Sequence, residues 1–164
     1  MLATVDAYNI SLFLHISAVV IGFGATYAEA IMFPVALKVS NQHLPYVHRL
    51  GMAINQRLAT PAMVVILITG IYQVAEDKGR GWEFGDAWVS ATFLILIVLG
   101  GLLGGYFVPT DRKLAEMAER DLASGSGEMS AEYQAGAKRI GAIGGLAGVL
   151  VLVAIFLMVT KPGA

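Results

Sequence analysis

Four long apolar stretches restrict this chain to a helical fold inside a membrane. They cover residues 10–37, 58–75, 87–108 and 140–159, and a helix that crosses a bilayer needs about 20 mostly apolar residues. Backbone polar groups find no water in hydrocarbon, so a spanning segment is a helix or part of a closed barrel. None of the four stretches shows the alternation of a transmembrane strand. We predict an all-α antiparallel bundle of four transmembrane helices, in a single domain over residues 1–164.

The composition excludes several functional classes. Hydrophobic residues make up 57 % of the chain and charged residues 14 %, whereas a soluble domain carries about 25 % charged residues. The absence of cysteine excludes a disulfide framework, an iron–sulfur cluster and a thiolate nucleophile. The net charge of −1 provides no basic surface for nucleic acid. The partner that the composition indicates is the lipid bilayer.

Positive charges are distributed unevenly between the two ends of the predicted bundle. Three of the eleven Lys and Arg residues, Lys78, Arg80 and Lys161, lie on the side of the termini, and the other eight lie in the connections after the first and third helices. Lys and Arg are in excess in cytoplasmic loops. We therefore expect both termini outside and those two connections in the cytoplasm.

The two cytoplasmic connections are expected to contain helices of their own. Pro109 is expected to end the third span. Residues 111–123 then predict a short amphipathic helix with ion pairs at i,i+4 spacing, Arg112/Glu116 and Glu116/Arg120. Pro45 is expected to begin a helix that leads into the second span, with a kink at Pro61.

Glycines recur at four-residue spacing in the third and fourth spans, a pattern that lets two helix backbones approach closely. We predict that these glycines pack the two helices together, with a glycine-lined path for a ligand or ion as the alternative. Glycine-rich faces also permit a homodimer or a partner in a membrane complex. The residues are Gly100, Gly101, Gly104, Gly105, Gly141, Gly144, Gly145 and Gly148.

Charged and polar residues gather near the inner ends of the first two spans. Glu29 lies at the inner end of the first span and Arg57 immediately precedes the second, so we predict a contact between them. Independent snorkelling of the two side chains is the alternative. His48 and Asn55 lie seven residues apart, on one face of the lead-in helix. They are either solvated interface residues or parts of an inner site with Glu29 and Arg57.

One face of the first span is small and polar. Ser11, His15, Gly22, Thr26 and Glu29 fall within about 60° of one line along the helix. His15 is the only histidine within the predicted spans. It either hydrogen-bonds a neighbouring helix, ligates a haem iron, porphyrin or metal, or takes part in proton transfer or transport. Gly22 would leave flat space for a macrocycle on the same face.

A second ligand for a haem at His15 has to lie at the same depth. His43 and His48 belong to the cytoplasmic connection, more than about 20 Å away along the helix. Met158, near the outer end of the fourth span, is at a suitable level, although methionines in helices usually serve packing. The sequence contains no motif for hydrolytic chemistry or for binding phosphate.

Short motifs across most of the chain resemble those of a known group. Leu14-His15 followed by small residues, Thr60-Pro61, and Pro109 before a charged helix are similar to the layout of uncharacterised bacterial four-helix membrane proteins. Those proteins resemble copper-resistance D-like and protoporphyrinogen-oxidase J-like small membrane proteins. The resemblance implies a location in the bacterial cytoplasmic (inner) membrane. It also implies that His15 is a haem or metal ligand.

Three functional hypotheses follow. In the first, His15 holds haem b or a porphyrin for electron transfer or for oxidation of a tetrapyrrole or quinol-type substrate, which would make the protein a membrane oxidoreductase. In the second, the stripe from Ser11 through His15 to Glu29 is the path of a carrier or channel for protons or a small solute. In the third, the protein is an accessory or structural subunit of a membrane complex.

Overall fold

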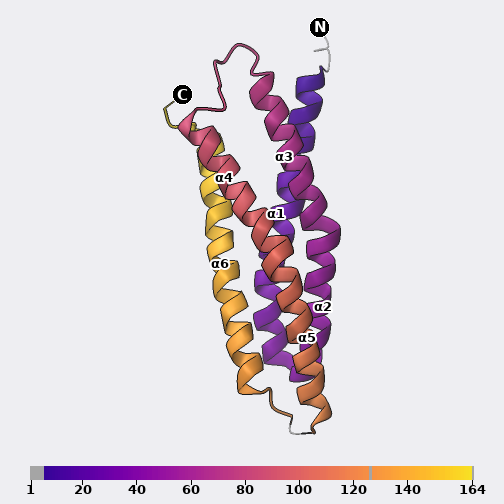
Figure 1. The fold of residues 1–164 in the computed structure, drawn as a ribbon. Helices are drawn as coiled ribbons and strands as arrows, with labels where there is room; N and C mark the ends of the chain where they lie inside the picture. The colour runs from indigo at the N-terminus through magenta and orange to yellow at the C-terminus, as the bar shows by residue number, and fades with distance from the viewer. Residues whose placement is uncertain (1–5, 126, 164) are drawn as a thin grey trace.

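The computed structural model describes residues 6–125 and 127–163, which form an all-helical bundle (Figure 1). Its first rod is α1 (Ala7–Val39), and its fourth is α6 (Ala131–Thr160). The second rod joins α2 (Leu44–Ile54), the π-helical turn η2 (Asn55–Ala59) and α3 (Thr60–Ala75). The third joins α4 (Ala87–Leu102), the π-helical turn η3 (Leu103–Phe107) and α5 (Val108–Ala123). A short 3-10 turn, η1 (Asn41–His43), connects the first two rods. The predicted fold class is confirmed.

Each of the four rods is long and apolar enough to cross a membrane. Neighbouring rods run antiparallel, so both ends of the described chain lie at the same end of the bundle as the loop between α3 and α4 (Figure 1). Large apolar side chains on the outside, such as Phe13, Ile31, Ile97 and Phe156, are more than half exposed. This outward-facing apolar surface is what a lipid environment requires.

The prediction that Pro109 ends the third helix is wrong. The helix continues from α4 through η3 into α5, and the charged segment 111–123 extends the third rod instead of forming a separate helix. The second rod is also continuous across Pro61. Pro45 does begin a helix, as predicted, since it occupies the first turn of α2.

A π-helical turn before each proline keeps the second and third rods continuous. In η2 the N–H of Thr60 bonds the carbonyl of Asn55, and in η3 the N–H of Val108 bonds that of Leu103. Each wide turn ends two residues before a proline, Pro61 or Pro109. Proline lacks an N–H and its ring crowds the carbonyl four residues earlier, so an added residue in the preceding turn makes room for the ring. Such π-turns occur often at functional sites.

The loop between α3 and α4 contacts the first and last helices at the end of the bundle that holds the termini. Trp82 packs edge-on against Trp88, with ring centroids 5.6 Å apart. The guanidinium of Arg80 lies 5.0 Å from the ring centres of both Tyr8 and Trp82, and the ammonium of Lys161 lies 5.0 Å from Trp82. Cation–π contacts thus connect the loop to both the first and the last helix.

Candidate functional site

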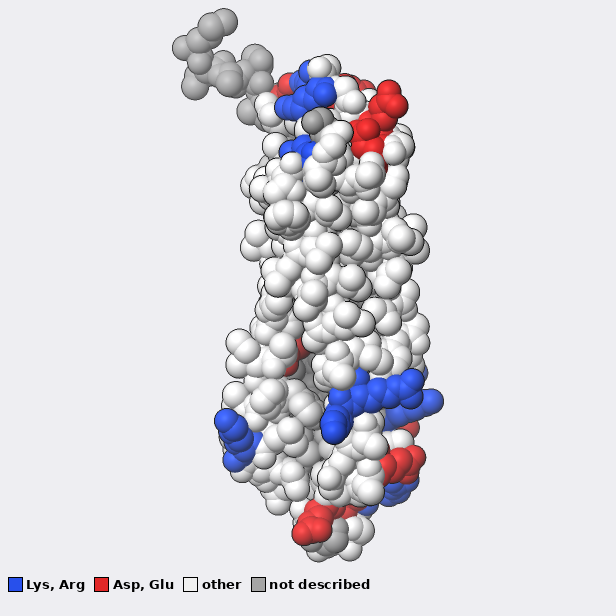
Figure 2. Space-filling model, turned by 90° about the vertical axis from the view of Figure 1, so that its left-hand side faces the viewer, with Lys and Arg blue, Asp and Glu red and all other residues white. Residues whose placement is uncertain are grey.

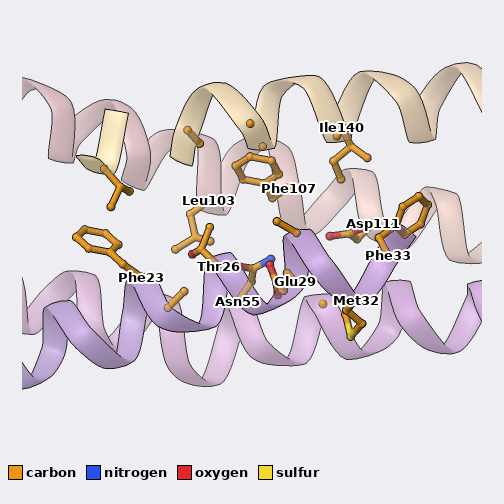
Figure 3. A pocket seen from close by; sticks show the side chains of 18 of the residues that line it. Phe23, Thr26, Glu29, Met32, Phe33, Asn55, Leu103, Phe107, Asp111 and Ile140 are labelled. Atoms are coloured by element: carbon orange, nitrogen blue, oxygen red, sulfur yellow. The ribbon is translucent and has the colours of Figure 1, made fainter. Parts of the chain in front are cut away.

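A cavity of about 360 Å³ lies inside the bundle, in the half away from the termini (Figure 3). Helix α1 and the second rod form one side, and the third rod and α6 form the other. Both π-turns contribute to its wall, through Asn55 and Ala59 of η2 and through Leu103 and Phe107 of η3. Most of the remaining lining is apolar, including Phe23, Met63, Ile66, Leu99, Ala147 and Val151.

The polar groups of the cavity gather around Glu29. Figure 3 shows the amide of Asn55 facing the Glu29 carboxylate, with the Asp111 carboxylate turned toward the same space. A Cβ placed on Gly51 would lie 3.7 Å from Oε1 of Glu29 and 3.6 Å from Oδ2 of Asp111. The two carboxylate oxygens therefore both lie close to the same glycine.

One oxygen of Glu29 is buried without a partner. Oε1 has almost no solvent-accessible surface and makes no hydrogen bond among the described residues. An unpaired buried carboxylate oxygen is costly. A group that supplies a hydrogen-bond donor or a positive charge to Oε1 would remove that cost.

His48 connects three helices beside Glu29. Its Nδ1 lies 2.7 Å from Oδ1 of Asp111 on α5, and its Nε2 lies 2.9 Å from the hydroxyl of Tyr133 on α6. Phe33 of α1 covers the imidazole, with ring centroids 5.1 Å apart. Both His48 and Tyr133 are at most 2 % exposed. Asp111 is thus held by one oxygen, while the other faces Gly51 and the cavity.

The cavity is negative and opens through the apolar side of the bundle. Figure 2 shows acidic atoms recessed in an opening of the uncharged belt, next to basic side chains. The acidic residues that line the cavity are Glu29 and Asp111, and none of the described lining residues is Lys or Arg. An amphipathic molecule in the membrane would reach the carboxylates through this opening.

The inner-site residues of the sequence analysis come together only in part. Glu29, His48 and Asn55 all line the cavity, so the interpretation of His48 and Asn55 as members of an inner site fits the geometry. Arg57 is exposed, and within the described chain neither Arg57 nor Glu29 has an opposite charge within 4.0 Å. The predicted contact between Glu29 and Arg57 is therefore not formed. Arg57 lies in η2, and its side chain is on the exposed side of that turn.

His15 and Ser11 lie on α1 against α3, outside the lining of the cavity. Nδ1 of His15 is 2.8 Å from Oγ1 of Thr69, and the Ser11 hydroxyl donates to the Thr69 carbonyl at 3.5 Å. The Thr69 hydroxyl donates to the carbonyl of Val65, so it accepts a hydrogen bond from His15. This fixes the proton on Nδ1 and leaves the lone pair of Nε2 free. Ligation of a haem or metal by His15 stays a prediction.

Gly22 and Thr26 serve the helix contacts of α1. A Cβ on Gly22 would lie 2.8 Å from that of Ala62, so the missing side chain lets α1 and α3 pack closely. Gly22 also lines the cavity, and space for a macrocycle beside it stays a prediction. Thr26 bonds the carbonyl of Gly22 at 3.3 Å and lines the cavity. Met158 is partly buried on α6. No cluster of three His, Asp or Glu side chains suited to a metal ion occurs in residues 6–125 and 127–163.

Most of the glycines at four-residue spacing lie in open space, which differs from the predicted close packing. A Cβ on any of the four glycines of the third rod, or on Gly141 or Gly145 of α6, would meet no atom within 4 Å. Close packing of α4 on α6 therefore does not depend on them. The helices diverge at the cavity, and the alternative of a glycine-lined space is closer to the geometry, because Gly141, Gly144 and Gly145 line it. Gly148 approaches Tyr27 of α1 instead.

The sequence analysis did not identify Asp111 and Tyr133 as site residues. Both lie in segments interpreted as cytoplasmic, and their contacts with His48 span 63 and 85 positions. Only the continuation of the third helix past Pro109 brings Asp111 into the bundle. The sequence does contain a tyrosine, Tyr133, near the start of a long apolar helix. A tyrosine at such a position by itself predicts packing and not a binding site.

Comparison with known proteins identifies a family. A family of sequences described as "Predicted integral membrane protein (DUF2269)" matches residues 9–162 of the chain. No curated protein and no solved structure matches. The match covers nearly the whole chain, including all four rods and every residue that lines the cavity. The chain belongs to this family.

Proposed function

We propose that this member of the DUF2269 family is a carrier for small amphipathic cations, which it binds in the inner cavity with the positive head group at Glu29. The observation that carries the proposal is the buried, unpartnered Oε1 of Glu29 at the polar end of an otherwise apolar cavity. In the bacterial cytoplasmic membrane, with the termini outside, this cavity lies in the cytoplasmic half. In this proposal Glu29 of the polar stripe binds the ligand, and Ser11 and His15 at the other end of the stripe serve helix packing.

The size and lining of the cavity support an organic ligand. A volume of about 360 Å³ falls at the lower end of ligand pockets, which span roughly 300–1,000 Å³ and are lined mostly by apolar and aromatic side chains. The rings of Phe23, Phe33 and Phe107 border this space. Aromatic faces attract organic cations within about 6 Å. A small apolar body with one charged group matches this lining better than an inorganic ion.

The charge of the site supports a positive head group. Glu29 and Asp111 lie around the same space beside Gly51, and the described lining residues include no Lys or Arg. The one histidine among them, His48, contacts Asp111 and not Glu29. A carboxylate in an apolar setting is strongly stabilised by an opposite charge within about 4–6 Å. An anionic ligand would meet repulsion from both groups.

The direct test measures binding of ethidium, a planar aromatic cation, to the protein in nanodiscs. We expect saturable binding to the wild type and a loss of at least about tenfold in affinity for Glu29→Gln, because the neutral amide keeps the size of the side chain but removes its charge. Glu116→Gln is the matched control, since Glu116 is an exposed carboxylate on α5 outside the cavity. Equal affinities for the wild type and Glu29→Gln would contradict the proposal.

A second candidate function, haem binding at His15, is favoured by the fixed tautomer of that residue. Metal-ligating histidines usually donate their other ring nitrogen to a fixed acceptor, and Thr69 provides that acceptor for Nδ1. The test is an absorption spectrum of the purified protein before and after reduction, next to His15→Ala. A reducible haem spectrum that His15→Ala abolishes would support it, and a featureless spectrum after haem supplementation would contradict it.

A further inference from the structure

Glu29 and Asp111 form a pair of carboxylates that shares one small space. Oε1 of Glu29 and Oδ2 of Asp111 both lie within 3.7 Å of the position of a Cβ on Gly51. Oε1 has no hydrogen-bond partner, and His48 engages Oδ1 of Asp111, not Oδ2. The carboxylate oxygens nearest to Gly51 are thus Oε1 of Glu29, which has no partner among the described residues, and the oxygen of Asp111 that His48 does not engage.

Such a pair does not hold two negative charges in an apolar cavity. Two carboxylates that share a site repel each other, so one of them keeps a proton. The titratable groups next to the pair are His48 from α2 and Tyr133 from α6, while η2 contributes the neutral amide of Asn55. No basic side chain from the described parts of α1, η3 or α5 lines the cavity. A cationic ligand can therefore replace the proton between the two carboxylates.

We propose that the acidic pair Glu29–Asp111 exchanges one proton for one cationic ligand, which makes binding an electroneutral exchange. This inference rests on the proposed function. In the empty state the pair is one carboxylic acid and one carboxylate. When the cation enters, the acid loses its proton, both carboxylates face the cation, and the proton leaves the pair. One positive charge enters and one leaves, so the charge of the cavity is unchanged.

The acidic pair is not sealed inside the bundle. The side chain of Asp111 is 13 % exposed, and Glu29 is also partly exposed. The proton can therefore leave the pair at an exposed side chain. The fixed oxygen of Asp111, bonded to His48, keeps the free oxygen directed to the gap beside Gly51.

The experiment measures protons released when ethidium saturates the wild-type protein in a weakly buffered solution. We expect release of about one proton per bound ethidium, and an affinity that rises by up to about tenfold per pH unit where the pair titrates. Asp111→Asn should bind ethidium more weakly, because only one carboxylate then faces the cation. Binding without proton release by the wild type would overturn the exchange while the proposed function stands. Absence of saturable binding at every pH would overturn both.

Gly51→Ala provides a second variant that keeps every titratable group. Its added methyl fits in ordinary contact, 3.6 Å from Asp111 and 3.7 Å from Glu29. We expect ethidium affinity to fall by at least about tenfold, because the methyl takes up space beside both carboxylates. Gly100→Ala is the control, because its methyl would meet no atom within 4 Å. Unchanged affinity in Gly51→Ala would contradict a ligand position between the two carboxylates.

Discussion

Nδ1 of His48 lies 2.7 Å from Oδ1 of Asp111, and this contact joins α2 to α5 across 63 positions of the chain. It exists only because the third helix continues through η3 and past Pro109. The other ring nitrogen of His48 reaches Tyr133 of α6. One imidazole thus fixes the relative positions of three helices at the inner end of the cavity, and the proposed site depends on it.

Replacement of His48 should destabilise the inner half of the bundle. His48→Ala leaves the carboxylate of Asp111 and the buried hydroxyl of Tyr133 without their shared partner, so we expect the free energy of unfolding to fall by about 3 kcal/mol. Unfolding in mixed micelles, followed by circular dichroism, measures it. His43→Ala is the control, because His43 is exposed in η1. Similar stabilities of the two variants would argue against a structural role of the His48 contacts.

Gly22 should be the glycine of α1 that tolerates substitution least. An alanine Cβ there would lie 2.8 Å from the Cβ of Ala62, which is closer than two carbon atoms can pack. Helices α1 and α3 would have to separate, and overpacking of this kind costs about 1–3 kcal/mol. The measurement is again the free energy of unfolding in mixed micelles.

Gly24→Ala is the matched control for Gly22→Ala. Gly24 lies on the same helix, is exposed, and has no atom within 4 Å of an added Cβ. Since alanine favours helix by up to about 1 kcal/mol over glycine, Gly24→Ala should leave stability unchanged or raise it slightly. A cost for Gly24→Ala equal to that for Gly22→Ala would show that contact with α3 is not the cause.

The helical bundle was predictable because hydrocarbon imposes a strong local requirement. The four apolar stretches identify the four rods directly, and the polar face of the first stretch correctly places Ser11, Gly22 and Glu29 toward neighbouring helices. The ends of the rods were less predictable. Proline normally interrupts a helix. No sequence pattern indicates the π-turns that allow the helices to continue through Pro61 and Pro109.

The composition of the site depended on contacts that no local pattern reveals. The predicted partner of Glu29 is Arg57, whereas the charged residue that lies with Glu29 around Gly51 is Asp111. The glycine spacing of the third and fourth spans is typical of close packing, yet packing also depends on how two helices cross. These helices diverge around the cavity, so the same spacing leaves open space there.

The loop between α3 and α4 should lose its structure when acid protonates Asp77. The Asp77 carboxylate accepts hydrogen bonds from the N–H groups of Gly79, Gly81 and Trp82 at 2.9, 2.6 and 3.1 Å. These donors, the first two most strongly, hold the pKa of Asp77 below its ordinary value of 3.8. Because the folded loop binds this proton more weakly than the unfolded chain, the stabilisation is full above pH 3.8. It is lost as the pH falls through the lower pKa of the folded loop.

Tryptophan fluorescence measures this transition, because the two tryptophans of the chain, Trp82 and Trp88, stack against each other beside the loop. Asp77→Asn should show altered fluorescence already at neutral pH and a smaller acid transition. The pKa of Asp6 is also lowered, chiefly by its hydrogen bond to Lys78 of the same loop, so Asp6→Asn separates the two contributions. An unchanged transition in Asp77→Asn would contradict the role of the Asp77 carboxylate.

The orientation of the bundle is the last expectation to test, since the direction of the proposed exchange depends on it. The chain has no cysteine, so single substitutions give an unambiguous label. In intact cells, a membrane-impermeant maleimide should modify Glu83→Cys in the loop between α3 and α4, because the scarcity of Lys and Arg on that side predicts an outer location. Glu116→Cys on α5 should react only after permeabilisation. The reverse pattern would place the Glu29 cavity in the outer half of the membrane, so protons would be exchanged with the outside.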